Sequence, residues 1–251
     1  MRDPIDFITS LPLPVMAALC LGTTLLLALT GAMVARSLRA RLGQDLVLTV
    51  PPVSFCGVLF SLVTAFLAAN VWDDTGTARR AVAAEAASLR TLNTALTVLP
   101  ADAAAPAWAA LSAYVAEVVA SEWPAMSRGA TDPAAGRRLA ELRRVVRALP
   151  PSPDQLRALH AVDAIAEDRD HRLILAWEYT GPLKWLAVLV MGSLFLTLLP
   201  LSLAARGRGM ALALTALSMG TILFTVVAYD RPFTGPQSVS PRPLLEAVVP
   251  E

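Results

Sequence analysis

The stretch that decides the fold covers residues 46–72 and has the sequence LVLTVPPVSFCGVLFSLVTAFLAANVW. It contains no charged residue, and a helix needs about 20 apolar residues to cross the hydrocarbon core of a bilayer. Pro51 and Pro52 stand near its start, where proline disturbs a helix least. We therefore predict a membrane-spanning helix at about residues 47–72.

Three further charge-free stretches predict spans at about residues 11–35, 184–205 and 209–229. The chain as a whole is 55% hydrophobic and 16% charged, whereas soluble domains carry about 25% charged residues. The predicted fold class is all-α. We expect an integral membrane four-helix transmembrane bundle, with a membrane-proximal helical domain inserted between the second and third spans.

The predicted spans divide the chain into four parts. These are a first transmembrane pair at 1–72, a helical extramembrane domain at 73–181, a second transmembrane pair at 182–230 and a C-terminal tail at 231–251. The formal net charge of +1 gives no electrostatic basis for binding nucleic acid. The lipid bilayer is the expected partner of the spans.

The short loops between the spans carry an excess of arginine. Four spans put both short loops on one side of the membrane and the helical domain on the other. The loop residues are Arg36, Arg39, Arg41, Arg206 and Arg208, against Asp45 alone. Arginine in short loops favours the cytoplasm, which would place the helical domain outside it.

Small residues recur every four positions in the second span, at Gly57, Ser61, Ala65 and Ala69. Such a face lets another helix approach closely, either within the bundle or along a pore. Ala216 and Gly220 form a shorter version in the fourth span. No ionisable residue lies deep in a span, which argues against a proton-coupled transporter but leaves a pore lined by hydroxyl groups and backbone open.

The helical pattern continues beyond Trp72 as an apolar seam with a seven-residue repeat. One row is Val82, Leu89 and Leu96, and the other is Ala78, Glu85, Leu92 and Leu99. Glu85 stands where an apolar residue is expected. Either it is buried and paired with Arg79, Arg80 or an arginine from another helix, or it lies in water at the edge of the seam.

Three more helices are predicted in the inserted domain. The first ends near Pro124 and has an apolar row at Trp108, Leu111, Val115 and Val118. The second starts at Asp132-Pro133 and has an apolar row at Leu139, Leu142, Val146 and Leu149. The third runs from Asp154 towards Tyr179 and has an apolar row at Leu159, Val162, Ala166, Leu173 and Ala176. The second also carries a basic face at Arg137, Arg138, Arg143, Arg144 and Arg147. This face either lies in water or contacts phospholipid headgroups or an acidic surface of the protein.

One face of the last of these helices carries residues that bind divalent ions in other proteins. They are His160, Asp163, Glu167, Asp170 and His171, related by steps of three and four. A solvated face of alternating charge is the other interpretation. No GxSxG, HExxH, P-loop or glycine-rich dinucleotide motif occurs, so no enzyme activity, catalytic residue or cofactor is predicted.

Two segments resemble a known family. Residues 66–74, FLAANVWDD with Trp72 and Asp73, continue through 78–86, ARRAVAAEA; the second segment is 230–235, DRPFTG, followed by VSP at 239–241. With the order of two spans, a helical insert and two spans, they resemble the bestrophin-like domain family, a mainly bacterial membrane family of unknown function. That family is distantly similar to the bestrophins, which are oligomeric anion channels with the same order of spans.

The resemblance implies a multi-pass protein of the bacterial plasma (inner) membrane, a homo-oligomer, and an anion-conducting pore. It also implies an insert in the cytosol, opposite to the side that the loop arginines indicate. In such a pore the small face of the second span would line the axis, with Asn70, Arg79 and Arg80 at the mouth. The alternative is a membrane-anchored sensor or scaffold whose helical domain binds a partner.

The second motif also has a physical interpretation of its own. Asp230 closes the last span at a helix C-terminus, where the dipole disfavours an anion, so pairing with Arg231, Arg79 or Arg80 would offset the cost. Pro232 and Gly235 favour a turn. We hypothesise that Phe233 then folds back and packs against the region 72–85.

Overall fold

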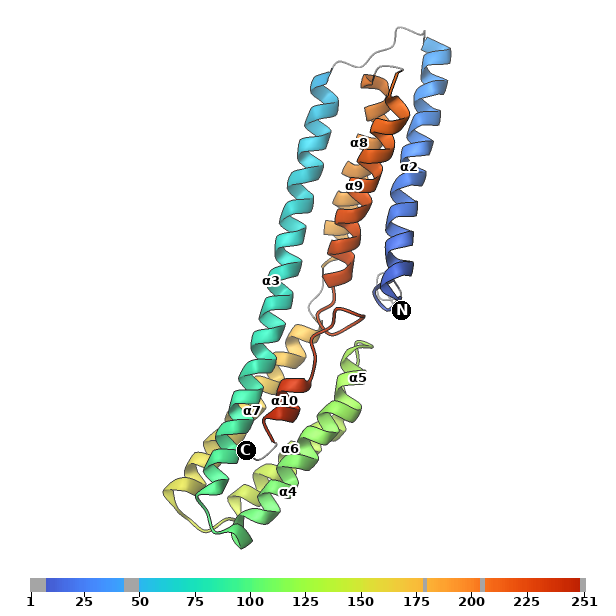
Figure 1. Cartoon of the computed structure of the whole chain (residues 1–251). Coiled ribbons are helices and arrows are strands. Elements are labelled where there is room, and N and C mark those ends of the chain that lie inside the picture. The colour runs from blue at the N-terminus through green and yellow to red at the C-terminus, as the bar shows by residue number, and fades with distance from the viewer. Residues whose placement is uncertain (1–7, 43–49, 178–179, 204–205, 249–251) are drawn as a thin grey trace. The chain divides into compact units, whose positions relative to one another are not determined.

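The computed structural model describes residues 8–42, 50–177, 180–203 and 206–248 (Figure 1). All regular structure in these residues is helical, which confirms the predicted all-α class. The chain forms two compact units. The membrane unit comprises Met1–Asp73 and Thr180–Asp230, and the insert unit comprises Asp74–Tyr179 and Arg231–Glu251. Positions 47–49, 204–205 and 179, which end predicted helices, lie outside the described residues.

The membrane unit contains the four predicted span regions. They are α2 (Leu13–Leu42), the first part of α3 (Val50–Thr97), α8 (Pro182–Ser202) and α9 (Arg208–Tyr229). α2 packs against both α8 and α9, and these two pack against each other. The apolar core of the unit includes Ala28, Phe60, Leu196, Ala216 and Val226.

Two glycines let the helices of the membrane unit approach closely. A Cβ atom on Gly31 of α2 would lie 2.6 Å from the carbonyl oxygen of Leu196 in α8. A Cβ atom on Gly220 of α9 would lie 2.7 Å from Thr24 Oγ1 in α2. Small residues at helix contacts are typical of membrane bundles, where close packing replaces the hydrophobic effect.

The insert unit consists of the second part of α3 with α4 (Ala101–Glu117), α5 (Trp123–Met126), α6 (Pro133–Arg147), α7 (Pro153–Trp177) and α10 (Arg242–Glu246). α4 packs on α6, and α6 packs on α7. Asp132 starts α6 as predicted, because its side chain accepts a hydrogen bond from the Ala134 amide at 2.8 Å. That hydrogen bond is the main cause that lowers the pKa of Asp132.

The predicted seam of α3 is confirmed. Leu89, Leu92 and Leu96 are fully buried in the core of the insert unit. The predicted rows of α4 and α6 also face this core. The row predicted for α7 is confirmed in part, since Val162 is buried and the rest of the row packs, partly buried, against this core. The most buried side of α7 also includes residues outside the predicted row, namely Gln155, Ala158, Ala161, Ile165, Arg172 and Leu175.

Polar partners explain why α7 also buries one amide and one charged side chain. Gln155 is buried because its side-chain amide donates to the carbonyl groups of Arg147 and Leu149, each at 3.0 Å. Arg172 is buried because it pairs with carboxylates of other helices. Both residues therefore occupy core positions that a hydropathy pattern assigns to apolar side chains.

The insert helix predicted to end near Pro124 passes through this proline and ends at Met126. A π-helical turn, η1 (Val118–Glu122), separates α4 from α5, and the Trp123 amide donates to the carbonyl group of Val118. Proline has no amide hydrogen and its ring crowds the carbonyl group four residues earlier, here that of Ala120. The wider turn accommodates this crowding and lets the helix continue to Met126.

Within the part of the chain that the structure describes, five helical stretches are apolar enough to cross a membrane, by length and composition alone. They are Leu13–Leu42, Pro52–Thr97, Ala101–Met126, Pro153–Ser202 and Arg208–Tyr229. The stretch Ala101–Met126 is the one not predicted as a span. It contains Asp102, Glu117 and Glu122, and its apolar residues belong to the core of the insert unit.

Candidate functional site

A cluster of ionised side chains lies at the centre of the insert unit. Glu85 is fully buried, and Arg172 of α7 donates to it from Nε at 2.6 Å and from Nη2 at 3.3 Å. Tyr114 of α4 donates to the same carboxylate at 2.7 Å. The structure thus confirms that Glu85 is buried and paired with an arginine from another helix. Arg79 and Arg80 are exposed.

A second carboxylate completes this cluster. Glu122 of η1 is also fully buried, and it accepts a hydrogen bond from Arg172 Nη2 at 2.8 Å. Arg169 donates to Glu122 from Nε at 3.0 Å and forms an ion pair with it through Nη2. We call Glu85, Tyr114, Glu122, Arg169 and Arg172 the buried charge cluster. Its two carboxylates and two guanidinium groups balance in charge, which is the condition for burying them.

The buried charge cluster changes the titration of its tyrosine. Burial of Tyr114 and the negative charge of Glu85 raise the pKa of the phenol well above its ordinary value. The neutral phenol therefore remains a hydrogen-bond donor to Glu85 throughout the physiological range. Carboxylates likewise raise the pKa of Arg172, and their attraction outweighs the burial that lowers it.

The C-terminal motif is linked to the same core. Phe233 is buried and meets Trp123 edge-on, with ring centroids 5.6 Å apart. The guanidinium carbon of Arg172 lies 5.1 Å from the centroid of the Trp123 ring. Trp123 therefore stands between the motif and the buried charge cluster, where an aromatic face stabilises a cation.

A tight turn holds Phe233 in this position. The Val239 amide donates to the carbonyl group of Pro232 at 2.7 Å, and Gly235 adopts a φ of 81°. Phe233 shares one core with Ala78 and Val82. The contact with Trp123 was not foreseen, and packing of this ending directly against the region 72–85 stays a hypothesis. Asp230 is buried at the C-terminal end of α9.

The small-residue face of α3 divides into a packed end and an exposed remainder. A Cβ atom on Gly57 would lie 2.9 Å from the ring of Phe195 in α8, so Gly57 is used in packing within the chain. Ser61, Ala65, Ala69 and Asn70 are exposed, and we call these four residues the α3 face.

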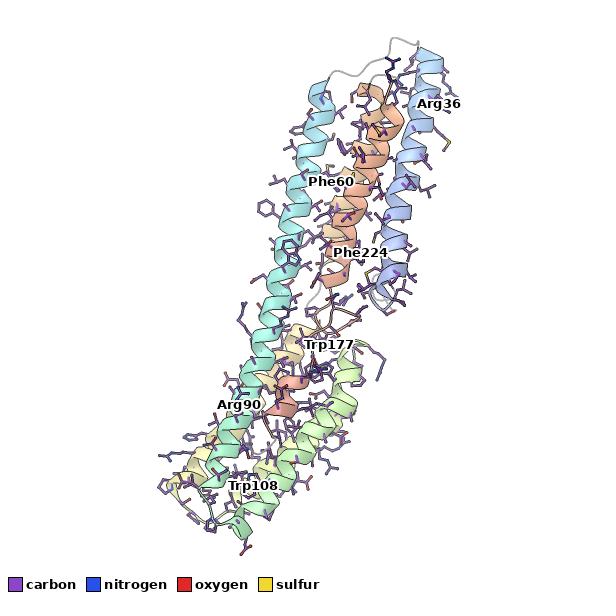
Figure 2. The ribbon with its side chains drawn as sticks, viewed as in Figure 1. Arg36, Phe60, Arg90, Trp108, Trp177 and Phe224 are labelled. Carbon is purple, nitrogen blue, oxygen red and sulfur yellow. The ribbon has the colours of Figure 1, made fainter. Side chains whose placement is uncertain are left out.

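Bulky residues lie beside the α3 face. Leu62 is 49% exposed and Phe66 is 65% exposed. The opposite side of α3 is buried in the core of the membrane unit, as Figure 2 shows for Phe60. A groove of about 840 Å³ lies between α3 and α8, and Gly57, Ser61 and Phe195 are among its lining residues. The exposed side of α3 therefore needs lipid, water or another chain against it.

The family model for the Bestrophin-like domain matches residues 17–244. The chain belongs to the Bestrophin-like domain family. The family inferred from the two motifs is thus confirmed. With its apolar helices, the bestrophin-like chain is a membrane protein. A search of curated proteins gave no match.

Solved structures share the bestrophin-like fold. A crystal structure of a bacterial bestrophin homologue from Klebsiella pneumoniae, with one substitution, is 19% identical; the match covers 92% of this chain and 97% of that chain at a TM-score of 0.69. Another substituted form of that homologue is 19% identical, with 92% and 98% covered and a TM-score of 0.71. A crystal structure of a membrane protein is 18% identical, with 91% and 97% covered and a TM-score of 0.70. These identities establish the fold alone.

The remaining predicted residues of the bestrophin-like chain are dispersed. Trp72, Asp73, Arg79 and Arg80 are exposed, unlike Glu85. Among the described residues no three His, Cys, Asp or Glu side chains lie close enough together to hold a metal ion. Of the metal candidates, Asp163 pairs instead with Arg143, and His160 lines a groove with Arg90 and Arg157. His160, Asp163, Glu167 and His171 are therefore not proposed as ligands.

Sequence reasoning missed the other members of the buried charge cluster. A signal was present for Glu122, because it continues the apolar row of Leu111, Val115 and Val118 at a step of four. Arg169 similarly follows Ile165 by four positions. Charged residues on the apolar rows of different helices are candidates to pair with one another in a bestrophin-like insert.

Proposed function

We propose that this chain is one subunit of an oligomeric anion channel, and that the α3 face lines its pore. The observation that carries the proposal is that α3 buries one side in its own bundle and leaves uncharged small and polar side chains on the other. In a ring of subunits such a face gives a narrow, wettable path, and the neighbouring Leu62 and Phe66 supply an apolar constriction. One copy provides only one such helix, so several copies are required.

The sign of the permeating ion follows from the charges further along α3. The helix continues without a break beyond Asn70, and Arg79 and Arg80 are exposed on it. Exposed arginines raise the local concentration of anions. Asp73 is exposed on the same helix and opposes them. Replacing Asp73 with Asn should therefore raise chloride flux, and replacing Arg79 with Gln should lower it.

The proposal includes four spans, α2, the first part of α3, α8 and α9, in the bacterial inner membrane. It leaves the fifth apolar stretch, Ala101–Met126, in the insert. That stretch holds the buried carboxylate of Glu122, whose partners Arg169 and Arg172 come from α7. A bilayer core offers no such partners to an isolated helix. The proposed protein is not an enzyme.

Chloride flux into vesicles reconstituted with the purified chain tests the pore. Ser61→Leu should abolish flux, because leucine would add apolar bulk to the α3 face. Ser218→Leu is the matched control. Ser218 is an exposed serine of α9 whose hydroxyl donates to the carbonyl group four residues earlier at 2.9 Å, as that of Ser61 does. Equal flux in the two variants, or no flux in the parent, would remove the proposal.

A membrane-anchored sensor or scaffold is the second candidate. An open groove of about 750 Å³ in the insert unit favours it, with Arg90, Arg157 and His160 among the lining residues (Figure 2 labels Arg90). Oligomeric state discriminates between the two functions. A chain that is monomeric both in detergent and in lipid would support the scaffold and exclude a pore built from one α3 per subunit.

A further inference from the structure

Among the arginines at one end of the membrane unit, Arg36, Arg39 and Arg208 lie near one another. Arg36 and Arg39 lie in the last turns of α2, and Arg208 is the first residue of α9. Arg36 and Arg39 are near enough to Arg208 for their charges to repel it. Figure 2 labels Arg36 at this end of α2. We call these three residues the arginine cluster.

Two of the three guanidinium groups are held in place by the end of α8. Arg39 Nη2 donates to the carbonyl groups of Pro200 and Leu201 at 2.9 and 3.3 Å. Arg208 donates to the carbonyl group of Leu203 from Nε at 3.2 Å and from Nη2 at 2.9 Å. Backbone carbonyl groups fix the positions of these side chains but carry no full charge. The cluster is therefore ordered without being neutralised by α8.

Arg36 and Arg208 have no carboxylate partner among the described residues. Arginine stays protonated in proteins, so it cannot relieve repulsion by losing a proton. The C-termini of α2 and α8 contribute about −0.5 charge each, and the N-terminus of α9 adds about +0.5. Counting Arg36 and Arg208 alone, about one and a half positive charges remain. Arg36 has no hydrogen-bond or ion-pair partner among the described residues.

The depth of the cluster matches that of lipid headgroups. At about 1.5 Å per residue, the part of α2 from residue 13 to residue 35 is about 34 Å long, and the part of α9 from residue 209 to residue 229 is about 31 Å long. The hydrocarbon core of a bilayer is about 30 Å thick. Arg36 directly follows the apolar part of α2, and Arg208 directly precedes that of α9. Both arginines therefore lie at the level of the lipid phosphates. Charge interactions are stronger there than in bulk water.

We propose that Arg36, Arg39 and Arg208 bind a phosphate group at this end of the membrane unit. A guanidinium group matches phosphate with two parallel hydrogen bonds, and Arg36 is free to form them. The first amides of α9 have no side-chain cap, so their N–H groups can also donate hydrogen bonds to an anion. The phosphate belongs either to an anionic phospholipid headgroup or to free inorganic phosphate. The site requires the membrane unit but not the proposed pore.

Lipid binding to the full-length protein tests the site and distinguishes the two sources. The purified chain in detergent is titrated with short-chain phosphatidylglycerol, with short-chain phosphatidylcholine and with inorganic phosphate, and binding is followed by native mass spectrometry and thermal shift. Preference for phosphatidylglycerol identifies the headgroup. Stabilisation by inorganic phosphate, lost in the same variants, identifies the free ion. Both outcomes support the proposal.

The variants are chosen so that loss of binding is not loss of fold. Arg36→Gln should weaken binding about tenfold, because it removes a charged hydrogen bond while touching no described contact. Arg208→Gln should weaken it at least as much. Arg41→Gln is the matched control, since Arg41 is an exposed arginine at the same end of α2. Equal weakening by Arg41→Gln would overturn the site in favour of general surface charge.

A further variant addresses Asp45, which lies outside the described residues. If the carboxylate of this loop residue neutralises the cluster, the parent chain will bind neither phospholipid nor phosphate, and Asp45→Asn will bind both. That result would overturn the proposal for the native chain. Binding in the parent that changes little in Asp45→Asn supports it.

Discussion

Removing Arg172 should destabilise the insert more than any other single truncation in the buried charge cluster. Arg172 is fully buried, donates to both Glu85 and Glu122 and lies over the ring of Trp123. Arg172→Met keeps most of the volume but leaves two carboxylates with only Arg169 to balance them. Breaking a buried ion pair by removing one partner costs about 3–5 kcal/mol. Domains are stable by about 5–15 kcal/mol in total, so a large part of the stability would be lost.

Thermal unfolding of the full-length chain in detergent measures this loss. For a unit of this size, 3–5 kcal/mol corresponds to a decrease in Tm on the order of 10 °C. Hydrogen exchange assigns the loss, because amides of α4 and α7 should lose protection while those of α2 and α9 keep it. Arg137→Met is the control, since Arg137 is exposed and its replacement should change stability by less than about 0.5 kcal/mol.

A double substitution distinguishes the charge argument from loss of packing. Glu85→Gln with Arg172→Met leaves Glu122 paired with Arg169, and the glutamine oxygen still accepts from Tyr114. Because the uncompensated charge is gone, the double variant should be more stable than Arg172→Met alone. A double variant no more stable than the single one, or a single variant within about 1 kcal/mol of the parent, would refute the reasoning.

Two further predictions concern single groups. Tyr114→Phe should cost about 1.5–3 kcal/mol, because it removes a hydrogen bond to the Glu85 carboxylate. Folding raises the pKa of Tyr114, so the contribution of this phenol to the free energy of unfolding is complete below pH 10. Above about pH 10 that contribution declines, by up to about 1.4 kcal/mol per pH unit. Urea unfolding at pH 8–11 should show this decline in the parent and not in Tyr114→Phe. Gly31→Ala should lower the Tm in detergent, because the new Cβ would lie 2.6 Å from the backbone oxygen of Leu196. Gly22→Ala is the control, since a Cβ atom there meets nothing within 4 Å, and it should be neutral or slightly stabilising in the same thermal unfolding experiment. Equal effects of the two glycine substitutions would contradict the close contact.

The all-α fold and most core positions of the insert could be predicted because each depends on a local pattern. Long charge-free stretches and a seven-residue repeat record the surroundings of a helix in its own sequence. The seam that includes Leu89 and Leu96 therefore faces the core, as predicted. The burial of Arg172 in α7 could not be predicted in this way, because it depends on partners supplied by α3 and η1.

The use of the small-residue face could not be decided from the sequence either. Gly57 and Ser61 are both small and lie one helical turn apart. The contact with Phe195 explains why residue 57 is a glycine, but no such contact explains the serine at residue 61. The exposed Ser61 has a hydroxyl satisfied within its own helix, by the carbonyl group of Gly57 at 2.9 Å. A satisfied hydroxyl is compatible with lipid, a neighbouring subunit or water. Local pattern therefore identifies the face, and only the assembly decides its role.

The buried charge cluster shows how a sequence can hold a long-range contact that no single helix reveals. Glu85, Glu122 and Arg172 each interrupt the buried side of a different helix, and each would be costly if its helix packed alone. The costs are removed together only when these three side chains meet, so the interruptions restrict which packings of the insert are stable. The π-helical turn before Pro124 contributes to this restriction, because its last residue, Glu122, pairs with Arg172, and the adjacent Trp123 also contacts Arg172. Because Phe233 packs on that tryptophan, the packing that pairs the charges is also the packing that receives the C-terminal motif.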